Sequence, residues 1–379
     1  MKILLIGEYS NLHNSLKKGL LNLGHEVTLI GSGDGFKKYS VDILITSTIF
    51  ENKFLKFFAK IIDRIFKFSL NELEIYFKTR EKIKDLRNFD VVQIINERSF
   101  NTTANLEIKL LGQIFKNNKK VFLMACGVDH KSVLYANEKK FKYSILTPFF
   151  KNSSLKKEYR HILKYLNPDH LKLSNYIQQN INGVISSDLD YHIPYQKSKN
   201  YLGMIPNPID IDSLKYSKIS TNNKIIILHA INSKNKLKKG NVFFEKSLKQ
   251  VEDLYKNKIE IIRTVDLPYS IHIKNVKKCH ILLDQVYAYD QGYNALEAMA
   301  MGKVVFTGAE KEWEKYYNIT EDSTVINALP DISYLVKKIS WLIENPEKLK
   351  IISKNAREFI VKYHDFNMIT KRYIEIWRN

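Results

Sequence analysis

Cysteine is scarce in this chain, and long apolar runs are missing. Among 379 residues only Cys126 and Cys279 carry a thiol. Two isolated thiols form neither a disulfide framework nor a zinc site, and such usage is typical of a reducing compartment. The apolar runs are far shorter than the roughly 20 residues that span a bilayer. The opening "MKILLIGEYS" leads into an expected strand without a cleavage site. The sequence therefore predicts a cytoplasmic protein.

Acidic residues are outnumbered. The chain has 60 Lys and Arg against 40 Asp and Glu, a formal net charge of +20. A field of this sign favours nucleic acid, anionic lipid headgroups or phosphorylated substrates as partners. The cations are spread over both halves, and no helix-turn-helix, zinc or RNP-type signature accompanies them. We therefore expect no nucleic-acid partner, and a basic nucleic-acid-binding protein is kept as an alternative.

Apolar segments alternate with amphipathic helical segments in two series. Alternation of this kind predicts parallel sheets covered by helices, and thus an α/β fold. Prolines 206 and 208 stiffen an extended connection between the two series, and residues 331–379 form an almost continuous helical pattern. The expected strands are 2–8, 27–32, 41–47, 89–96, 120–127 and 183–187, then 224–230, 259–265, 280–285 and 303–308.

A carboxylate, Glu297, interrupts the apolar helix expected over 293–301. Burying an unpaired carboxylate is costly, so Glu297 is exposed, paired, or met by the hydroxyls of a ligand. A helix N-terminus offers free N–H groups to a phosphate, here from Gly292, Tyr293 and Asn294. One turn further on, the carboxylate suits the vicinal hydroxyls of a ribose. The pattern favours a nucleoside diphosphate site, and an acid that only complements the helix dipole is the alternative.

The segment "NALEAMAMGKVV" (294–305) resembles the nucleotide-sugar signature of the family-four glycosyltransferases. These have the GT-B fold, in which two Rossmann-like domains face each other across a cleft and the C-terminal helix crosses back to the N-terminal domain. The resemblance implies an acceptor-binding domain over residues 1–203 and a nucleotide-sugar-binding domain over 204–362. Residues 363–379 would pack back on the first domain, and Glu297 would bind the donor's ribose.

The chain departs from the family pattern at one position. The family has a first acid eight residues before the ribose-binding one, where it contacts the transferred sugar, but here Tyr289 occupies that place. Asp290, next to it, is the candidate that could take over the catalytic role with a shift of one residue. The departure keeps open an inactive homologue that acts as a partner subunit.

Lysines crowd the segment "HAINSKNKLKKGNVFF" (229–244). By order and approximate spacing, Lys234 and the pair Lys239–Gly240 match the family's cations that neutralise the donor diphosphate. Fixed positive charge there lowers the barrier for a leaving nucleoside diphosphate. A solvated lysine-rich loop is the alternative, and it is the interpretation we give to Lys236 and Lys238.

Two polar loops of the first domain are the candidates for the rest of the site. The loop after the first strand has a single glycine and bears side chains suited to acceptor hydroxyls, namely Glu8, Tyr9, His13 and Asn14; helix-capping or surface roles are the alternative. The loop after strand 120–127 carries Asp129 and His130. Family members keep a histidine in this region near the donor sugar, so we predict both residues to be catalytic.

The segment "KFLKFFAKIIDRIFKF" (53–68) is basic on one helical face and aromatic or aliphatic on the others. This composition is typical of a helix that lies in a membrane interface. An ordinary surface helix packed on its own domain is the alternative.

Together with the resemblance, these features predict a retaining glycosyltransferase. It would move a sugar from a nucleotide-diphosphate sugar to a glycan or lipid-linked acceptor in bacterial surface-polysaccharide assembly, peripheral at the inner face of the cell membrane. The leaving phosphate would take the acceptor's proton, so we expect no cofactor. We also expect no metal, because the "DLD" of residues 188–190 lies in the interdomain segment. A sugar epimerase or a phosphorylase of the same architecture is a rival.

Overall fold

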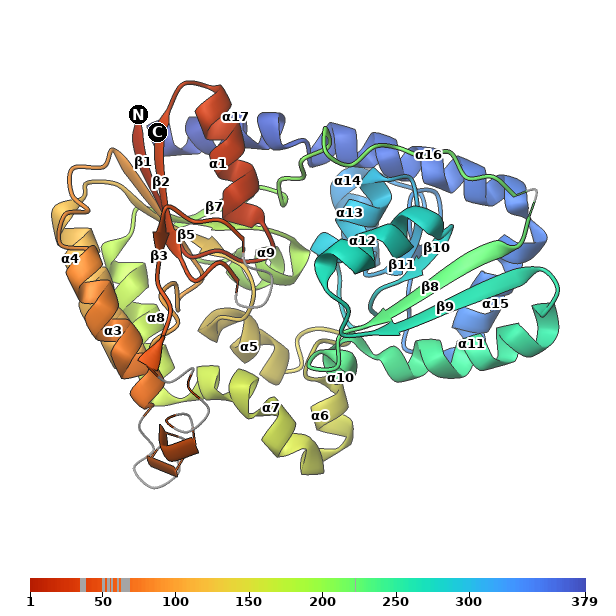
Figure 1. Cartoon of the computed structure of the whole chain (residues 1–379), viewed down its shortest axis with the longest axis horizontal. Coiled ribbons are helices and arrows are strands. Elements are labelled where there is room, and N and C mark those ends of the chain that lie inside the picture. Colours follow the sequence, from red (N-terminus) through yellow and green to blue (C-terminus); the bar gives the residue numbers. More distant parts are fainter. Residues whose placement is uncertain are drawn as a thin grey trace.

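The computed structural model of the protein describes residues 1–34, 39–49, 52, 55, 57–59, 61–62, 69–221 and 223–379. Within them the chain forms two α/β units, each built on a sheet whose pairings are all parallel (Figure 1). The first sheet has the order β3-β2-β1-β4-β5-β6-β7. Its strands are β1 (Lys2–Ile6), β2 (Glu26–Gly31), β3 (Ile43–Leu44), β4 (Val91–Ile95), β5 (Val121–Ala125), β6 (Gly183–Ser186) and β7 (Tyr201–Met204).

Helices cover both faces of the first sheet because its strands are apolar on both sides. Ile3 and Leu5 of β1 belong to one apolar cluster, whereas Leu4 and Ile6 belong to another, as expected from the two-residue period of a strand. The helices of this unit are α1 (Leu12–Asn22), α3 (Leu70–Lys82), α4 (Ala104–Asn117), α5 (His130–Asn137), α6 (Thr147–Lys151), α7 (Lys156–Leu163), α8 (Pro168–Asn180) and α9 (Leu189–Tyr195), with 3₁₀ turns η3 (Ser153–Leu155) and η4 (Lys164–Leu166).

The second sheet has the order β12-β11-β10-β8-β9. Its strands are β8 (Ile225–Ile231), β9 (Ile259–Val265), β10 (Ile281–Leu283), β11 (Val304–Thr307) and β12 (Ile326–Asn327). Its helices are α10 (Lys236–Lys239), α11 (Asn241–Tyr255), α12 (Tyr269–Lys278), α13 (Tyr293–Ala300), α14 (Lys311–Tyr317), α15 (Ile332–Glu344) and α16 (Pro346–Tyr363). One continuous apolar core lies between these elements, and Gly302 ends α13 with a φ of 75°.

The last helix, α17 (Phe366–Arg378), returns to the first unit. The chain leaves α16 at His364, and the Asp365 carboxylate accepts a hydrogen bond from the N–H of Asn367 at 2.7 Å, which starts a new helix. In Figure 1, α17 lies beside α1. Tyr373 and Trp377 of α17 belong to the apolar cluster that α1 shares with the first sheet. The predicted fold class, two Rossmann-like units with a C-terminal helix crossing back, is confirmed.

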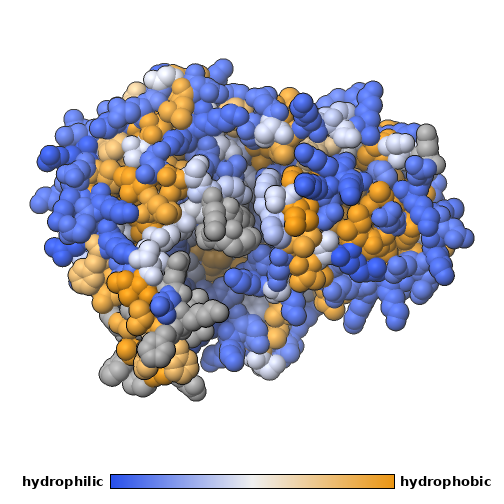
Figure 2. All heavy atoms as spheres, in the orientation of Figure 1, coloured by the Kyte–Doolittle hydropathy of each residue, from blue (hydrophilic) through white to orange (hydrophobic). Residues whose placement is uncertain are grey.

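Two local expectations fare differently. The strand expected over 41–47 is only the two-residue β3, with Asp42 and Ser47 hydrogen-bonding outside the ladder. In the segment 53–68, residues 53, 54, 56, 60 and 63–68 lie outside the described residues, so its basic face is not described. The described part leaves several large apolar side chains exposed, Leu55, Phe57, Phe58 and Ile61. Hydrophobic atoms also gather at this end of the molecule (Figure 2). None of the described helices combines the length and apolarity needed to cross a membrane.

Candidate active site between the two units

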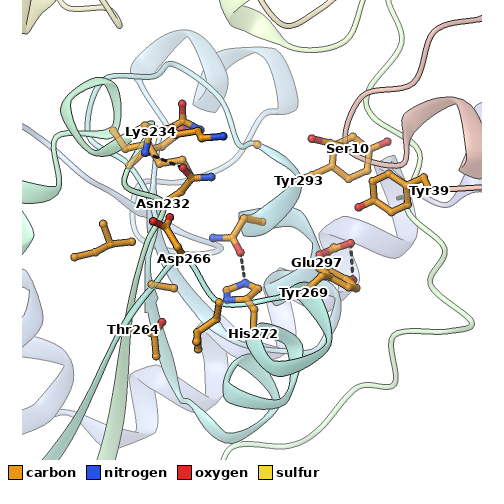
Figure 3. A pocket seen from close by; sticks show the side chains of 18 residues that line it. Ser10, Tyr39, Asn232, Lys234, Thr264, Asp266, Tyr269, His272, Tyr293 and Glu297 are labelled. Carbon is orange, nitrogen blue, oxygen red and sulfur yellow. Dashed lines mark hydrogen bonds between the residues drawn. The ribbon is translucent and has the colours of Figure 1, made fainter. Parts of the chain in front are cut away.

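A cavity of about 630 Å³ lies where the two sheets face each other. The second unit contributes the ends of β8, β9 and β10 and the starts of α12 and α13. The first contributes Ser10 and Tyr39, which approach from the opposite side (Figure 3). All six residues predicted to bind the donor line this cavity, namely Glu297, Lys234, Lys239, Gly292, Tyr293 and Asn294. The structure thus brings together positions up to 63 residues apart in the chain.

Glu297 lies at one end of the cavity. Its Oε1 accepts a hydrogen bond of 3.0 Å from the hydroxyl of Tyr269, the first residue of α12 (Figure 3). Burial and the nearby Glu297 carboxylate raise the pKa of Tyr269, so its hydroxyl keeps its proton and acts as the donor. Gly292 precedes α13 without a side-chain cap, which leaves the helix start open toward the cavity. The helix α13 therefore carries a carboxylate that accepts hydrogen bonds from hydroxyls, and its uncapped start offers N–H groups to an anion.

A chain of polar contacts joins Lys239 to the start of α13 and to α12. Lys239 Nζ lies 2.7 Å from Oδ1 of Asp284, whose side chain is fully shielded from solvent at the end of β10. The same Oδ1 accepts a bond of 2.8 Å from the amide of Asn294. Because that amide nitrogen donates to Asp284, the Asn294 oxygen must accept from His272 Nε2, 2.7 Å away. Asp284 thereby orients a cation and the helix start at once.

Several lining residues were not predicted from the sequence, including Tyr269, His272 and Tyr39. The signal available for the first two is that the helix after β9 carries them, and strand ends of parallel sheets form ligand sites. Tyr39 follows β2 in the same way. Asp284 lies at the end of the expected strand 280–285, but no pattern singled out its role.

Asp129 and His130 lie outside this cavity. The Asp129 side chain is fully buried, accepts from the Ser132 N–H at 2.7 Å and caps α5, so a catalytic role for it does not fit its placement. Nδ1 of His130 lies 2.7 Å from the carbonyl of Tyr165. A carbonyl only accepts, so Nδ1 of His130 carries a proton and donates it. His130 is half-buried in the first unit, and its backbone N–H donates to the Glu97 carboxylate.

Tyr289 and Asp290 also point away from the donor-side residues. The Tyr289 ring packs 4.8 Å from that of Phe141, and its hydroxyl accepts from a backbone N–H of the first unit. The Asp290 carboxylate accepts from the N–H of Leu189 at 3.0 Å. In return the Asp190 carboxylate accepts from the N–H groups of residues 289 and 290. The substitution of Asp290 for the missing acid does not fit this placement, which instead ties the two units together.

The four predicted acceptor residues make their hydrogen bonds within the first unit. Glu8 is 2% exposed, and its Oε2 accepts from both the backbone and side-chain nitrogens of Asn14. Tyr9 donates to Asn101. His13 is fully buried between the Gly7 carbonyl and Gln93, and burial lowers its pKa to about 4, so it is neutral. Direct acceptor contact therefore does not fit His13. From this loop it is Ser10 that lines the cavity.

In the described part of the chain, no group of three or more His, Cys, Asp and Glu side chains is arranged to hold a metal ion. The two thiols, Cys126 and Cys279, are both buried and free. The polar side chains that line the cavity carry hydroxyls, amides, ammonium groups, carboxylates and the imidazole of His272, and such groups suit a ligand rich in hydroxyls and phosphates.

Comparison with known proteins places the fold. No protein-family profile matches the chain, and no curated protein matches its sequence. Many solved structures match, among them three that align over nearly their whole length. A sucrose-phosphate synthase from Thermosynechococcus elongatus gives a TM-score of 0.62 at 11% identity, covering 100% of this chain and 98% of that one. HepE from Anabaena, solved with UDP and glucose, gives 0.59 at 13%, covering 99% of each chain. A Listeria monocytogenes protein proposed to be a UDP-N-acetylglucosamine 2-epimerase gives 0.51 at 11%, covering 99% and 95%.

The chain therefore has the GT-B fold of nucleotide-sugar glycosyltransferases. The identities are low, so the likeness establishes the fold, and the function has to be argued from the site.

Proposed function

We propose that the protein is a glycosyltransferase that moves a sugar from a nucleoside-diphosphate sugar to a glycan or lipid-linked acceptor. One observation carries the proposal. Glu297, an acid able to accept hydrogen bonds from hydroxyls, and Lys239, a cation able to face phosphates, line one cavity together with the uncapped start of α13. A nucleoside-diphosphate sugar has groups that match both residues. Its ribose hydroxyls can donate to the carboxylate, and its phosphates can accept from the lysine and the helix start. The structure of HepE with UDP and glucose, which shares the fold, supports a nucleotide as the ligand.

The chemistry follows from the charges. As the bond between the sugar and the diphosphate breaks, negative charge develops on the phosphates, and Lys239 together with the α13 start stabilises it. We propose retention of configuration, with the acceptor hydroxyl attacking on the face that the diphosphate leaves and the leaving phosphate oxygen taking its proton. Asp284 holds Lys239 in place, and Ser10 and Tyr39 close the cavity from the first unit. No step needs a metal ion.

The experiment is a calorimetric panel of nucleoside diphosphates and their sugars. A nucleotide that binds only the folded state stabilises it, so one of the panel should raise the melting temperature and give a saturable heat. Glu297→Ala should abolish that binding, whereas Asp129→Asn, in the first unit, should keep it. If no nucleotide in the panel binds, the proposal fails.

Rivals remain testable with the same ligand. An epimerase of this fold would isomerise the nucleotide sugar with no acceptor present, whereas a transferase releases nucleoside diphosphate only when it has an acceptor. An inactive partner subunit would bind the nucleotide sugar but would not turn it over with any acceptor. A phosphorylase would need phosphate in place of a nucleotide. Binding of oligonucleotides in a gel shift at physiological salt would favour a nucleic-acid binder.

We further propose a cytoplasmic protein that works at the inner membrane face in bacterial surface-polysaccharide assembly. The two free thiols fit a reducing compartment. The exposed Leu55, Phe57, Phe58 and Ile61, in a chain of net charge +20, support contact with an anionic bilayer. Phe57→Ser/Phe58→Ser should reduce sedimentation with phosphatidylglycerol vesicles. Unchanged sedimentation would rule out this contact.

A further inference from the structure

A second hollow, of about 1010 Å³, lies along α7 and is lined almost entirely by polar side chains. We call it the basic groove, and its lining residues are Ser154, Lys156, Lys157, Arg160, His161, Leu163, Lys164 and Asn167. Four of these side chains are cations, and none is acidic. Clustered like charges repel one another, and an anion bound between them offsets this repulsion.

The cations of the basic groove form no ion pair in the described part of the chain, although the Glu72 carboxylate lies near enough to Lys164 to favour its protonated form. No ion pair involves Lys156, Lys157, Arg160 or Lys164, although many other lysines of the protein are paired. Lys164 is half-buried, and burial together with the neighbouring Arg98 guanidinium lowers its pKa to about 8. Burial and Lys238 likewise lower the pKa of His161. A bound anion would reverse both effects, because it favours the protonated forms.

The place of the basic groove links it to the candidate active site. Lys238 and Lys239 are neighbours in α10, and they serve different sides. Lys239 lines the donor cavity, whereas Lys238 Nζ lies 3.4 Å from His161 Nε2 in the groove. At the other end, η4 carries both Lys164 and the carbonyl that accepts from His130. In Figure 1, α7 crosses below the junction of the two units, with α10 and α6 beside its end.

The lining also limits what the groove can recognise. Among the described residues that line the groove, no carboxylate is available to accept hydrogen bonds from a ribose, and no Phe, Tyr or Trp ring is present to stack on a base or a sugar. A second nucleotide site is therefore unsupported. Lysine and arginine side chains that converge without acids recognise phosphate by charge and by hydrogen bonds from their N–H groups.

We propose that the basic groove binds a phosphate or diphosphate group of the acceptor, so that the acceptor is an anionic molecule and not a neutral glycan. The identification of the bound anion as part of the acceptor rests on the proposed function. The binding of the anion itself does not depend on it, because the groove lies outside the donor cavity. The phosphate could belong to a lipid-linked sugar or to a soluble phosphorylated glycan.

The test is a calorimetric titration of inorganic pyrophosphate into four proteins: the wild type, the groove variant Lys157→Gln/Arg160→Gln, the donor-cavity variant Lys239→Gln, and the control Lys348→Gln/Lys350→Gln. The control loses the same charge from exposed positions of α16. Lys157 and Arg160 are exposed and make no side-chain hydrogen bond to the described residues, so the groove variant should fold. Circular dichroism checks this, and Lys164→Gln provides an independent second variant.

We expect the wild type and the control to bind pyrophosphate at two classes of site. Lys239→Gln should weaken one class, and the groove variant should weaken the other about tenfold, with strong dependence on salt. The nucleotide found by the panel should displace pyrophosphate from the first class only. Equal binding by the groove variant, or loss of all binding with Lys239→Gln alone, would overturn the proposal. So would loss of phosphatidylglycerol vesicle binding in the groove variant with pyrophosphate binding intact.

The two sources of phosphate are separated with farnesyl diphosphate and glucose 1-phosphate. Tighter binding of farnesyl diphosphate than of pyrophosphate, lost in the groove variant, would support a lipid-linked acceptor. Binding of glucose 1-phosphate with similar sensitivity would support a soluble one. If the nucleotide panel fails but groove binding persists, the proposed function falls while the anion site stands.

Discussion

Glu297 offers the sharpest test of how this cavity recognises a ligand. Replacing Glu297 by Gln keeps the shape of the side chain and removes its charge. A hydrogen bond to a charged group contributes about 1.5–3 kcal/mol and one to a neutral group about 0.5–1.5 kcal/mol. Two ribose hydroxyls on the carboxylate would therefore lose about 2 kcal/mol together, which raises Kd about 30-fold. Glu297 is half-buried and accepts a hydrogen bond from Tyr269, which a Gln oxygen can also accept, so the fold should tolerate Gln.

The assay is calorimetry with the nucleoside diphosphate selected by the panel and with its 2′-deoxy form. In the wild type, the missing hydroxyl should cost about tenfold or more in Kd, because a charge-assisted bond is lost. In Glu297→Gln the same deletion should cost only about fivefold, since the remaining bond is neutral. Tyr269→Phe is the control, because it leaves the carboxylate in place and should keep the larger penalty. An equal 2′-deoxy penalty in the wild type and in Glu297→Gln would refute the ribose assignment.

Three further predictions concern a lysine of the cavity, two buried carboxylates and a glycine with positive φ. Lys239→Met should weaken the nucleoside diphosphate about tenfold in calorimetry and leave the parent nucleoside unchanged, since only the phosphates meet this cation. Burial raises the pKa of Asp190 to about 7 and that of Asp290 to about 6, so the folded state binds more protons than the unfolded state between about pH 4 and 7. The free energy of unfolding should fall as pH rises through this window, and Asp190→Asn should flatten the slope by up to about 1.4 kcal/mol per pH unit. Gly7→Ala should lower the free energy of unfolding by more than about 1 kcal/mol, because φ is 86° and a Cβ would lie 2.2 Å from Ile95 Cγ2.

Each of these has its own check. Equal losses for nucleoside and nucleoside diphosphate would remove Lys239 from the phosphate site. Denaturant titrations at several pH values measure the second effect, and an unchanged slope in Asp190→Asn would show that this carboxylate is not a source of it. Gly24→Ala is the matched control for Gly7→Ala, because Gly24 also has positive φ (76°) while a Cβ there meets nothing within 4 Å. Equal destabilisation of both would leave only the backbone effect.

The regular parts of the fold followed from local patterns. The expected strands are present in the structure, although β3 is short. A parallel strand that is covered on both faces has a continuous apolar run, as in β1 and β4. The helical tail is broken near Asn345 and His364, where the sequence has "NPEK" and "YHDF". The short β3 was overpredicted, since an apolar run alone does not reveal that polar neighbours will bond elsewhere. The donor side was predictable because α13 carries its groups within a few residues of one helix start.

The remaining part of the site depended on contacts that no local pattern encodes. The sequence determined that Glu297 and the Lys239–Gly240 pair follow parallel strands, and strand ends of one sheet meet at one edge, so their convergence was fixed by topology. Only the tertiary structure decided that Asp290 turns toward α9, about a hundred residues earlier in the chain, where backbone N–H groups and burial hold it. The direction of a side chain at such a junction depends on the packing of both units, which two-residue and helical periods do not contain.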